Sequence, residues 1–239
     1  MIGRRLFAFG PLVAALALIP SAQATVNGNV ALRLTFSTTT PGSSSGVHVD
    51  VRLGNPVGSA HKPSPLTGAV IRLPKGTVIN TALRPQCTAA DAEMQAAGTL
   101  ACASDSQVGK GSLEGQTGFG APIDPLVGDD TVFNGDNELI EIVTPPGAPA
   151  PAAGVDHLTI KGNTLTAHPP SVPGGPPDYK TAIKRITFVI PAFASGDKPY
   201  LTTPPTCPKS GRWRTFAVFY FADGSHNGVT ADTPCHPTG

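Results

Sequence analysis

Five oxygen-bearing side chains between residues 130 and 141 have the spacing of a calcium-binding loop. They match five positions of an EF-hand loop: the first (Asp130), the fifth (Asn134), the seventh (Asp136), the ninth (Glu138) and the twelfth (Glu141). The third position holds Val132 instead of an oxygen donor, and the flanking residues have the character of strands. Asn134-Gly135 is also a strong hairpin-turn signal. Two interpretations stay open, a weak calcium site and a metal-free β-hairpin, and the sequence favours the hairpin.

Two further patterns could carry catalysis. The segment 42–46, with Ser44 at its centre, matches GxSxG, but a nucleophile elbow needs a strand before it and a helix after it. Here the motif lies in a Ser/Thr/Gly-rich turn between two predicted strands. His48, Asp50 and Arg52 share one face of a predicted strand, which is more typical of a solvated polar face than of an acid–base pair. HExxH is absent, and no catalytic residue is predicted.

The elements that must position these residues are mainly β-strands. Apolar and polar residues alternate in 30–36 and 47–53, which is the pattern of half-buried antiparallel strands. Residues 215–222 are apolar on both faces, which predicts a central strand covered on both sides. Trp213, close to this strand, is expected in the core more often than at a binding surface. Further strands are predicted at 69–73, 139–143, 158–160 and 183–190.

One helix is predicted over residues 89–97. Thr88 is its expected N-cap, Asp91 holds the capping-box position, and Gly98 is expected to end it. The abundance of glycine (27) and proline (26) favours short strands joined by many turns. The predicted fold is therefore all-β, an antiparallel sandwich of the immunoglobulin or jelly-roll type with one short helix between Cys87 and Cys102.

Four cysteines are expected to form two disulfides. No two of them have CxxC spacing. The one histidine at a sequence spacing that would suit a shared metal ion is His236, directly after Cys235. A metal site is therefore disfavoured. Four cysteines allow three pairings. We expect the local one, Cys87–Cys102 and Cys207–Cys235, because each pair brackets a compact segment.

Residues 1–24 have the parts of a cleaved secretory signal peptide. Arg4 and Arg5 precede the apolar run 6–19, and Ala22-Gln23-Ala24 forms a cleavage box. The run Arg4-Arg5-Leu6-Phe7 also fits a twin-arginine signal, although an ordinary export signal is favoured. The mature chain is expected to be secreted or held at the cell envelope, without a membrane span. Without Arg4 and Arg5 it keeps 15 of the 17 basic residues against 16 acidic ones, and this near balance argues against a nucleic-acid partner.

Residues 25–239 are expected to form a single domain. The Pro-rich segments 145–154 and 169–177 could be linkers between domains, but only about 14 residues separate them, too few for a domain. We therefore expect both segments to be loops between neighbouring strands.

Two groups of motifs resemble those of actinobacterial secreted proteins without an assigned role. Leu73-Pro74-Lys75-Gly76, Cys87 and the segment 102–111 resemble an LPxG…C…CPxSxVGxG pattern. The segment 202–213, with 223–225 and 233–235, resembles TTPxxCPxSGxW…DGS…TPC. Ala103 departs from the usual proline, and Asp105 is an additional residue. The resemblance covers roughly residues 66–115 and 185–236. It implies a secreted β-rich domain with both local disulfides, and it implies no catalytic residues.

These features favour an exported protein without enzymatic activity, acting as a binding or structural domain. A protein or glycan ligand is a possible partner, and no cofactor is predicted apart from the calcium alternative. A secreted hydrolase with dispersed catalytic residues and a calcium-dependent adhesion module stay open as alternatives. A pocket with convergent titratable groups would favour the enzyme.

Overall fold

The computed structural model describes residues 23–27, 29–54 and 62–236. The predicted signal peptide lies outside the described residues, except for Gln23 and Ala24 at its end. No helix within the described ranges is long and apolar enough to span a membrane.

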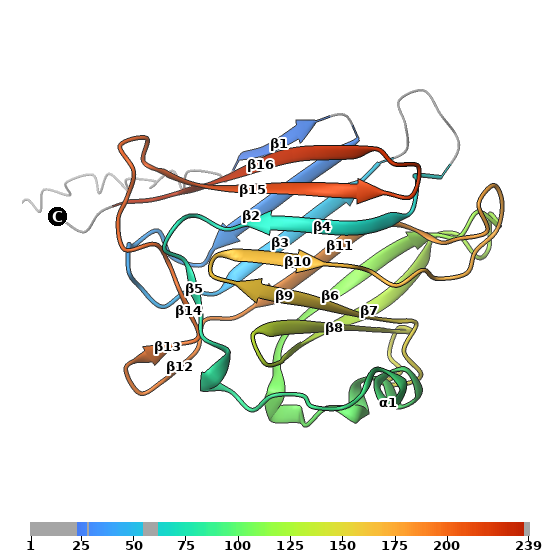
Figure 1. The fold of residues 1–239 in the computed structure, drawn as a ribbon, viewed down its shortest axis with the longest axis horizontal. Helices are drawn as coiled ribbons and strands as arrows, with labels where there is room; N and C mark the ends of the chain where they lie inside the picture. Colours follow the sequence, from blue (N-terminus) through green and yellow to red (C-terminus); the bar gives the residue numbers. More distant parts are fainter. Residues whose placement is uncertain (1–22, 28, 55–61, 237–239) are drawn as a thin grey trace, which may run out of the picture.

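Twelve antiparallel strands form one sheet that closes into a barrel (Figure 1). Around the barrel the order is β1-β16-β15-β4-β10-β9-β8-β7-β6-β11-β3-β2. The strands are β1 (Gln23–Asn27), β2 (Val30–Phe36), β3 (Val47–Leu53), β4 (Leu66–Arg72), β6 (Gln107–Gln116), β7 (Leu126–Asn134), β8 (Glu138–Thr144), β9 (Gly154–Lys161), β10 (Thr164–Ala167), β11 (Ala182–Ile190), β15 (Arg212–Phe221) and β16 (His226–Pro234). Two short pairs complete the β-structure, β5 (Val78–Ile79) with β14 (Leu201–Thr202) and β12 (Ala194–Ser195) with β13 (Lys198–Pro199).

The predicted class, nearly all β and antiparallel, is confirmed. The finer prediction of an immunoglobulin-like or jelly-roll-like sandwich is not confirmed, because the twelve strands follow one another around a single sheet. Both Pro-rich segments connect strands of this sheet, 145–153 between β8 and β9 and 168–181 between β10 and β11.

The main core fills the barrel interior. In β2 and β3 every second residue is buried, as the alternation predicts, and these residues meet the inward side chains of the other strands. Trp213 is fully buried there, contacts Phe36 edge-on and donates its indole N–H to the carbonyl of Thr206. The interpretation of Trp213 as a core residue is therefore confirmed.

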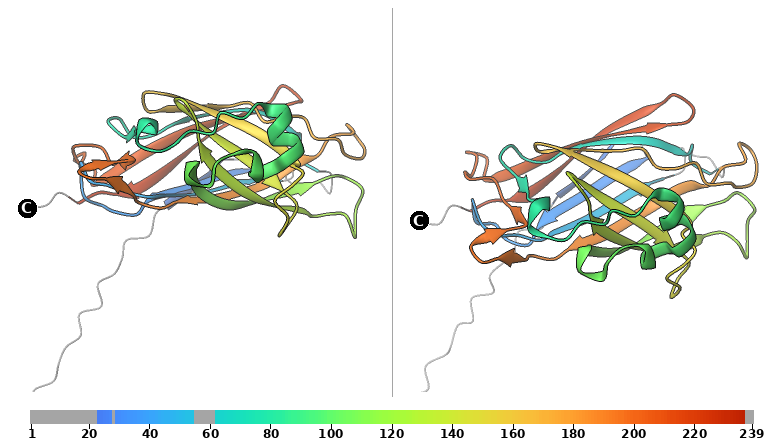
Figure 2. Two further views of the ribbon diagram at one scale, coloured as in Figure 1. Left: turned by 90° about the horizontal axis from the view of Figure 1, so that it is seen from below. Right: turned by 60° about the horizontal axis from the view of Figure 1, so that its bottom comes forward.

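A second core lies outside the barrel, where residues 81–106 cover the outer face of β7, β8 and β9 (Figure 2). We call residues 81–106 the covering segment. It contains α1 (Asp91–Ala97) and the short helices η1 (Thr81–Leu83), η2 (Gly98–Ala101) and η3 (Ser104–Ser106). Met94 of α1 packs over Phe133, Ile140 and Ile142. Strand β8 is consequently covered on both faces.

The prediction that residues 215–222 form a strand covered on both sides is wrong. Strand β15 alternates between buried and exposed residues, and Phe216 and Tyr220 are 41% and 43% exposed. Its apolar outer residues are not covered, because the covering segment lies over β8 instead.

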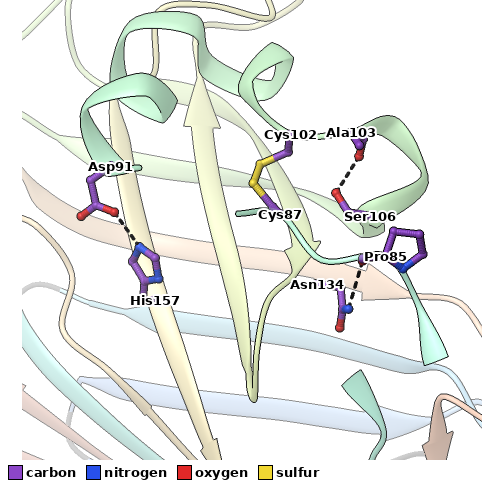
Figure 3. Close-up of a disulfide and its surroundings, with 8 residues drawn as sticks. All are labelled: Pro85, Cys87, Asp91, Cys102, Ala103, Ser106, Asn134 and His157. Atoms are coloured by element: carbon purple, nitrogen blue, oxygen red, sulfur yellow. Dashed lines mark hydrogen bonds and ion pairs between the residues drawn. A yellow bond between two sulfur atoms is a disulfide. The ribbon is translucent and has the colours of Figure 1, made fainter. Parts of the chain in front are cut away.

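Both disulfides have the predicted pairing, Cys87–Cys102 and Cys207–Cys235. The first closes the covering segment over the barrel (Figure 3). His157 of β9 holds α1 to the barrel as well, with one ring nitrogen 3.1 Å from Asp91 and the other 3.0 Å from Glu138.

The helix is confirmed, but its predicted start is wrong. It begins at Asp91, with Ala90 at the N-cap and no side-chain capping bond, so Thr88 is not its cap. Its end is as predicted. Gly98 has φ +58° and donates its N–H to the carbonyl of Met94.

Candidate functional site

A cavity of about 270 Å³ opens at one end of the barrel, and we call it the barrel pocket. Its walls are inward residues of β6, β7, β8, β9 and β11, and both Pro-rich loops form its rim. The wall is largely apolar and includes Leu113, Val143, Ile183 and Ile186; the rim includes Pro145, Pro146, Pro169, Pro170 and the exposed residues Ala153 and Ser171. Ligand sites of barrel proteins commonly lie in such a position.

Two carboxylates line the barrel pocket, and a third lies beside them. Glu141 on β8 pairs in register with Asp156 on β9, so both side chains point to the same face of the sheet. Asp130 on β7 pairs with Val143, which stands two residues after Glu141 on the same face. Three neighbouring strands thus bring Asp130, Glu141 and Asp156 together inside the barrel. We call these residues the acid cluster.

The acid cluster is poorly solvated. Asp130 is 1% exposed, and neither of its carboxylate oxygens has a hydrogen-bond partner among the described residues. Glu141 is 8% exposed, because β8 is covered on both faces. Asp156 is half-buried and accepts the backbone N–H of His168 at 3.3 Å. Buried carboxylates without partners are rare, since burial penalises the ionised form.

Burial and mutual repulsion raise the pKa values of all three carboxyls. Desolvation, followed by the charge of Asp156, raises the pKa of Asp130 to about 7. Desolvation and the two neighbouring acids raise the pKa of Glu141 well above its usual range. Desolvation raises the pKa of Asp156 to about 6, although nearby N–H groups and histidines oppose the rise. The acid cluster therefore retains protons near neutral pH and can donate hydrogen bonds, accept them or bind a cation.

The rim of the pocket is fixed by a buried lysine. Lys62 donates its ammonium to the carbonyls of Thr117, Gly175 and Lys180, and it forms an ion pair with Asp178 at 2.6 Å. These bonds tie the β10–β11 loop to the end of β6. The rim is therefore held in place without a ligand, as in many binding sites.

The calcium-loop residues predicted from the sequence divide into two places. Residues 130–141 form the β7–β8 hairpin, so the hairpin interpretation is confirmed. Asp130 and Glu141 come together in the acid cluster. Asp136 lies exposed in the turn, and Glu138 pairs with His157. Among the described residues, no group of three or more acidic, histidine or cysteine side chains could hold a metal ion.

Asn134 has a structural role at the opposite end of the barrel. Its amide nitrogen donates to the carbonyls of Thr81, Arg84 and Pro85, which anchors the start of the covering segment. Figure 3 shows the bond to Pro85. Its oxygen accepts the hydroxyl of the fully buried Tyr200 at 2.9 Å. These partners satisfy a buried amide that would otherwise be unstable in the core.

The other sequence candidates do not meet at a site. Ser44 is exposed in the β2–β3 loop, without the strand-to-helix turn of a nucleophile elbow. His48 is exposed on the outer face of β3. Asp50 accepts two bonds of 2.9 Å from Arg185 and one of 3.4 Å from Arg52. These bonds lower the pKa of Asp50 despite partial burial, so it serves as an ion-pair partner.

Asp156 is the member of the acid cluster that sequence reasoning missed. It is 15 positions from Glu141, beyond a Pro-rich loop, and only the β8–β9 register brings the two together. One feature of the sequence points to this site. Glu141 stands between Ile140 and Ile142 in the predicted strand 139–143, whose other residues are all apolar, so a charged residue there needs an explanation.

Comparisons with protein-family models, with curated proteins and with solved structures give no match to the chain.

Proposed function

We propose that the protein is an exported binding protein and that the barrel pocket holds a small, largely apolar ligand. The observation that carries this proposal is the cavity of about 270 Å³, which has an apolar wall and two carboxylates at one place in it. An engineered cavity of about 150 Å³ is sufficient to bind benzene. A molecule with one or two rings would therefore fit the barrel pocket.

Export is supported by the two disulfides, since such bonds persist in oxidising compartments. The predicted signal peptide and the resemblance to actinobacterial secreted proteins point to the same location. A binding role also accounts for the acid cluster. Three carboxylates with raised pKa values destabilise the fold near neutral pH, and unfavourable groups of this kind concentrate at functional sites.

The acid cluster favours a hydrolase as the second candidate. A protonated carboxyl with a pKa near the working pH is suited to act as a general acid, and Asp156 has a pKa of about 6. Within the described lining, the one hydroxyl or thiol nucleophile outside the threonines is Ser171, which is exposed at the rim. The binding role is therefore the better supported.

The test is a titration with prodan, an uncharged dye whose fluorescence reports an apolar environment. Wild-type protein is expected to bind the dye with a blue-shifted emission. The variant Ala153→Trp places a bulky side chain at the rim and is expected to weaken binding at least about tenfold. Val189→Trp is the matched control, because Val189 lies on the outer face of β11 and is 47% exposed. Equal binding by both variants, or none by the wild type, would overturn the proposal.

A further inference from the structure

We propose that the ligand of the barrel pocket is a primary amine on an apolar body, with its ammonium group bound by Glu141 and Asp156, the two carboxylates of the pocket wall. This inference rests on the proposed function and specifies the ligand class of the same site.

The first argument is the absence of a counter-charge. No ion pair joins a basic side chain to any member of the acid cluster in the part of the chain that the structure describes. His157 points away from the pocket, to Asp91 and Glu138, and the Lys62 ammonium is held by carbonyls and Asp178. Both oxygens of Asp130 lack a hydrogen-bond partner among the residues that the structure describes. The acid cluster thus has no basic partner among the described residues, and a ligand cation would supply one.

The second argument is energetic. Transferring an ammonium from water to an apolar site is strongly unfavourable unless a carboxylate pairs with it. In this pocket Glu141 has already lost most of its hydration, since it is 8% exposed, and the neighbouring Asp130 is 1% exposed. The ion pair therefore forms at a site where charge-assisted hydrogen bonds are strong. An anionic ligand would meet repulsion at the same place.

The third argument concerns the kind of cation. Quaternary ammonium groups are bound by aromatic cages, because they have no N–H donors. The described lining of the barrel pocket contains no phenylalanine, tyrosine or tryptophan. A primary ammonium has three donors, and the two carboxylates of the pocket wall, Glu141 and Asp156, can accept them. The composition of the site therefore favours a primary amine.

Binding is coupled to proton release. The acid cluster retains protons near neutral pH, and an ammonium favours its ionised form, so protons leave as the amine enters. The charged and titratable groups nearby are His157 and His168, which act on Asp156, and Lys180 at the exposed rim. Because the carboxyls lose their protons as pH increases, amine affinity is expected to increase from pH 5 to pH 8.

The experiment is isothermal titration calorimetry with three ligands that share one ring system. These are 1-naphthylmethylamine, 1-naphthalenemethanol and 1-naphthoic acid, titrated at pH 7.5 in phosphate and in Tris. We expect the amine to bind at least about tenfold more tightly than the alcohol, and the acid to bind more weakly than both. The two buffers differ in ionisation enthalpy, so the apparent binding enthalpy of the amine, and not of the alcohol, should differ between them.

Two amide variants locate the effect. Glu141→Gln and Asp156→Asn are each expected to reduce amine affinity about tenfold and alcohol affinity by less than about threefold, because the amide removes the charge and keeps a hydrogen-bonding group. Asp136→Asn, in the exposed β7–β8 turn, is the control and should bind as wild type does. If amine and alcohol bind equally, the amine inference is overturned while the binding proposal stands. If neither binds, both are overturned.

Discussion

Replacing Asp130 by asparagine is expected to stabilise the protein at pH 8 and to stabilise it much less at pH 5. Asp130 is 1% exposed, and its carboxylate has no partner among the described residues. Asparagine has nearly the same shape and does not ionise, so the substitution removes the charge and little else.

The size of the effect follows from the pKa of Asp130. Desolvation and the charge of Asp156 raise this pKa from 3.8 to about 7, and each pKa unit corresponds to about 1.4 kcal/mol. Ionising Asp130 is thus about 4 kcal/mol less favourable in the folded chain than in the unfolded one. Because the folded-state pKa is raised, the wild type loses this free energy of unfolding as pH increases from about 4 to about 7. Below pH 4 nothing is lost, since both states are protonated.

The expected gain for Asp130→Asn at pH 8 is about 2–4 kcal/mol. This gain is smaller than the full cost of ionising Asp130 in the folded chain, because the buried carboxamide of asparagine carries an additional unpaired donor. At pH 5 the unfolded carboxyl has ionised while the folded one is still largely protonated, so the wild type has lost only about 1.6 kcal/mol and the variant should gain at most about 2 kcal/mol.

The assay is urea unfolding of the disulfide-intact protein at both pH values, followed by the fluorescence of the single, buried Trp213. Asp136→Asn is the control, because Asp136 is exposed in the β7–β8 turn. A gain of equal size at pH 5 and pH 8, or a loss at pH 8, would refute the reasoning.

Two other substitutions, each with a control variant, test contacts that stabilise the fold. Gly98→Ala should reduce the free energy of unfolding by about 2–4 kcal/mol, since φ is +58° and a Cβ would lie 1.9 Å from the carbonyl oxygen of Pro149. Gly147→Ala, with φ +72° and nothing within 4 Å, should lose only about 1 kcal/mol in the same urea assay, and equal losses would contradict the steric argument. Tyr200→Phe should cost about 1–2 kcal/mol because Asn134 loses its buried donor, whereas Tyr220→Phe, on the outer surface, should cost nothing measurable. Similar thermal unfolding of the two tyrosine variants would exclude a stabilising role for that hydrogen bond.

Local patterns in the sequence predict much of the fold. Alternation locates β2 and β3, the Asn134-Gly135 turn locates the β7–β8 hairpin, and compact spacing predicts both disulfides. Strand β6 escapes prediction because its sequence, QVGKGSLEGQ, has three glycines and weak alternation. Its pairing with β7 and β11 compensates for that low propensity.

Features that depend on long-range packing are not predictable from such patterns. Strand β8 is covered on both faces because the covering segment folds over it, whereas the apolar outer residues Phe216 and Tyr220 of β15 have no cover. The acid cluster illustrates the same limit. Asp130 and Glu141 attract attention as calcium ligands, but their partner Asp156 is set by the register of β9 on β8.

The most direct test of the binding site is a methyl NMR titration of the isotopically labelled protein with 1-naphthalenemethanol. Signals of Leu113, Val143 and Ile186, which line the barrel pocket, are predicted to shift as the ligand is added. Leu34, deep in the barrel core, and Val189, on the outer surface, should keep their positions. Shifts confined to surface methyl groups such as that of Val189, or no shifts at all, would contradict the assignment of the barrel pocket as the ligand site.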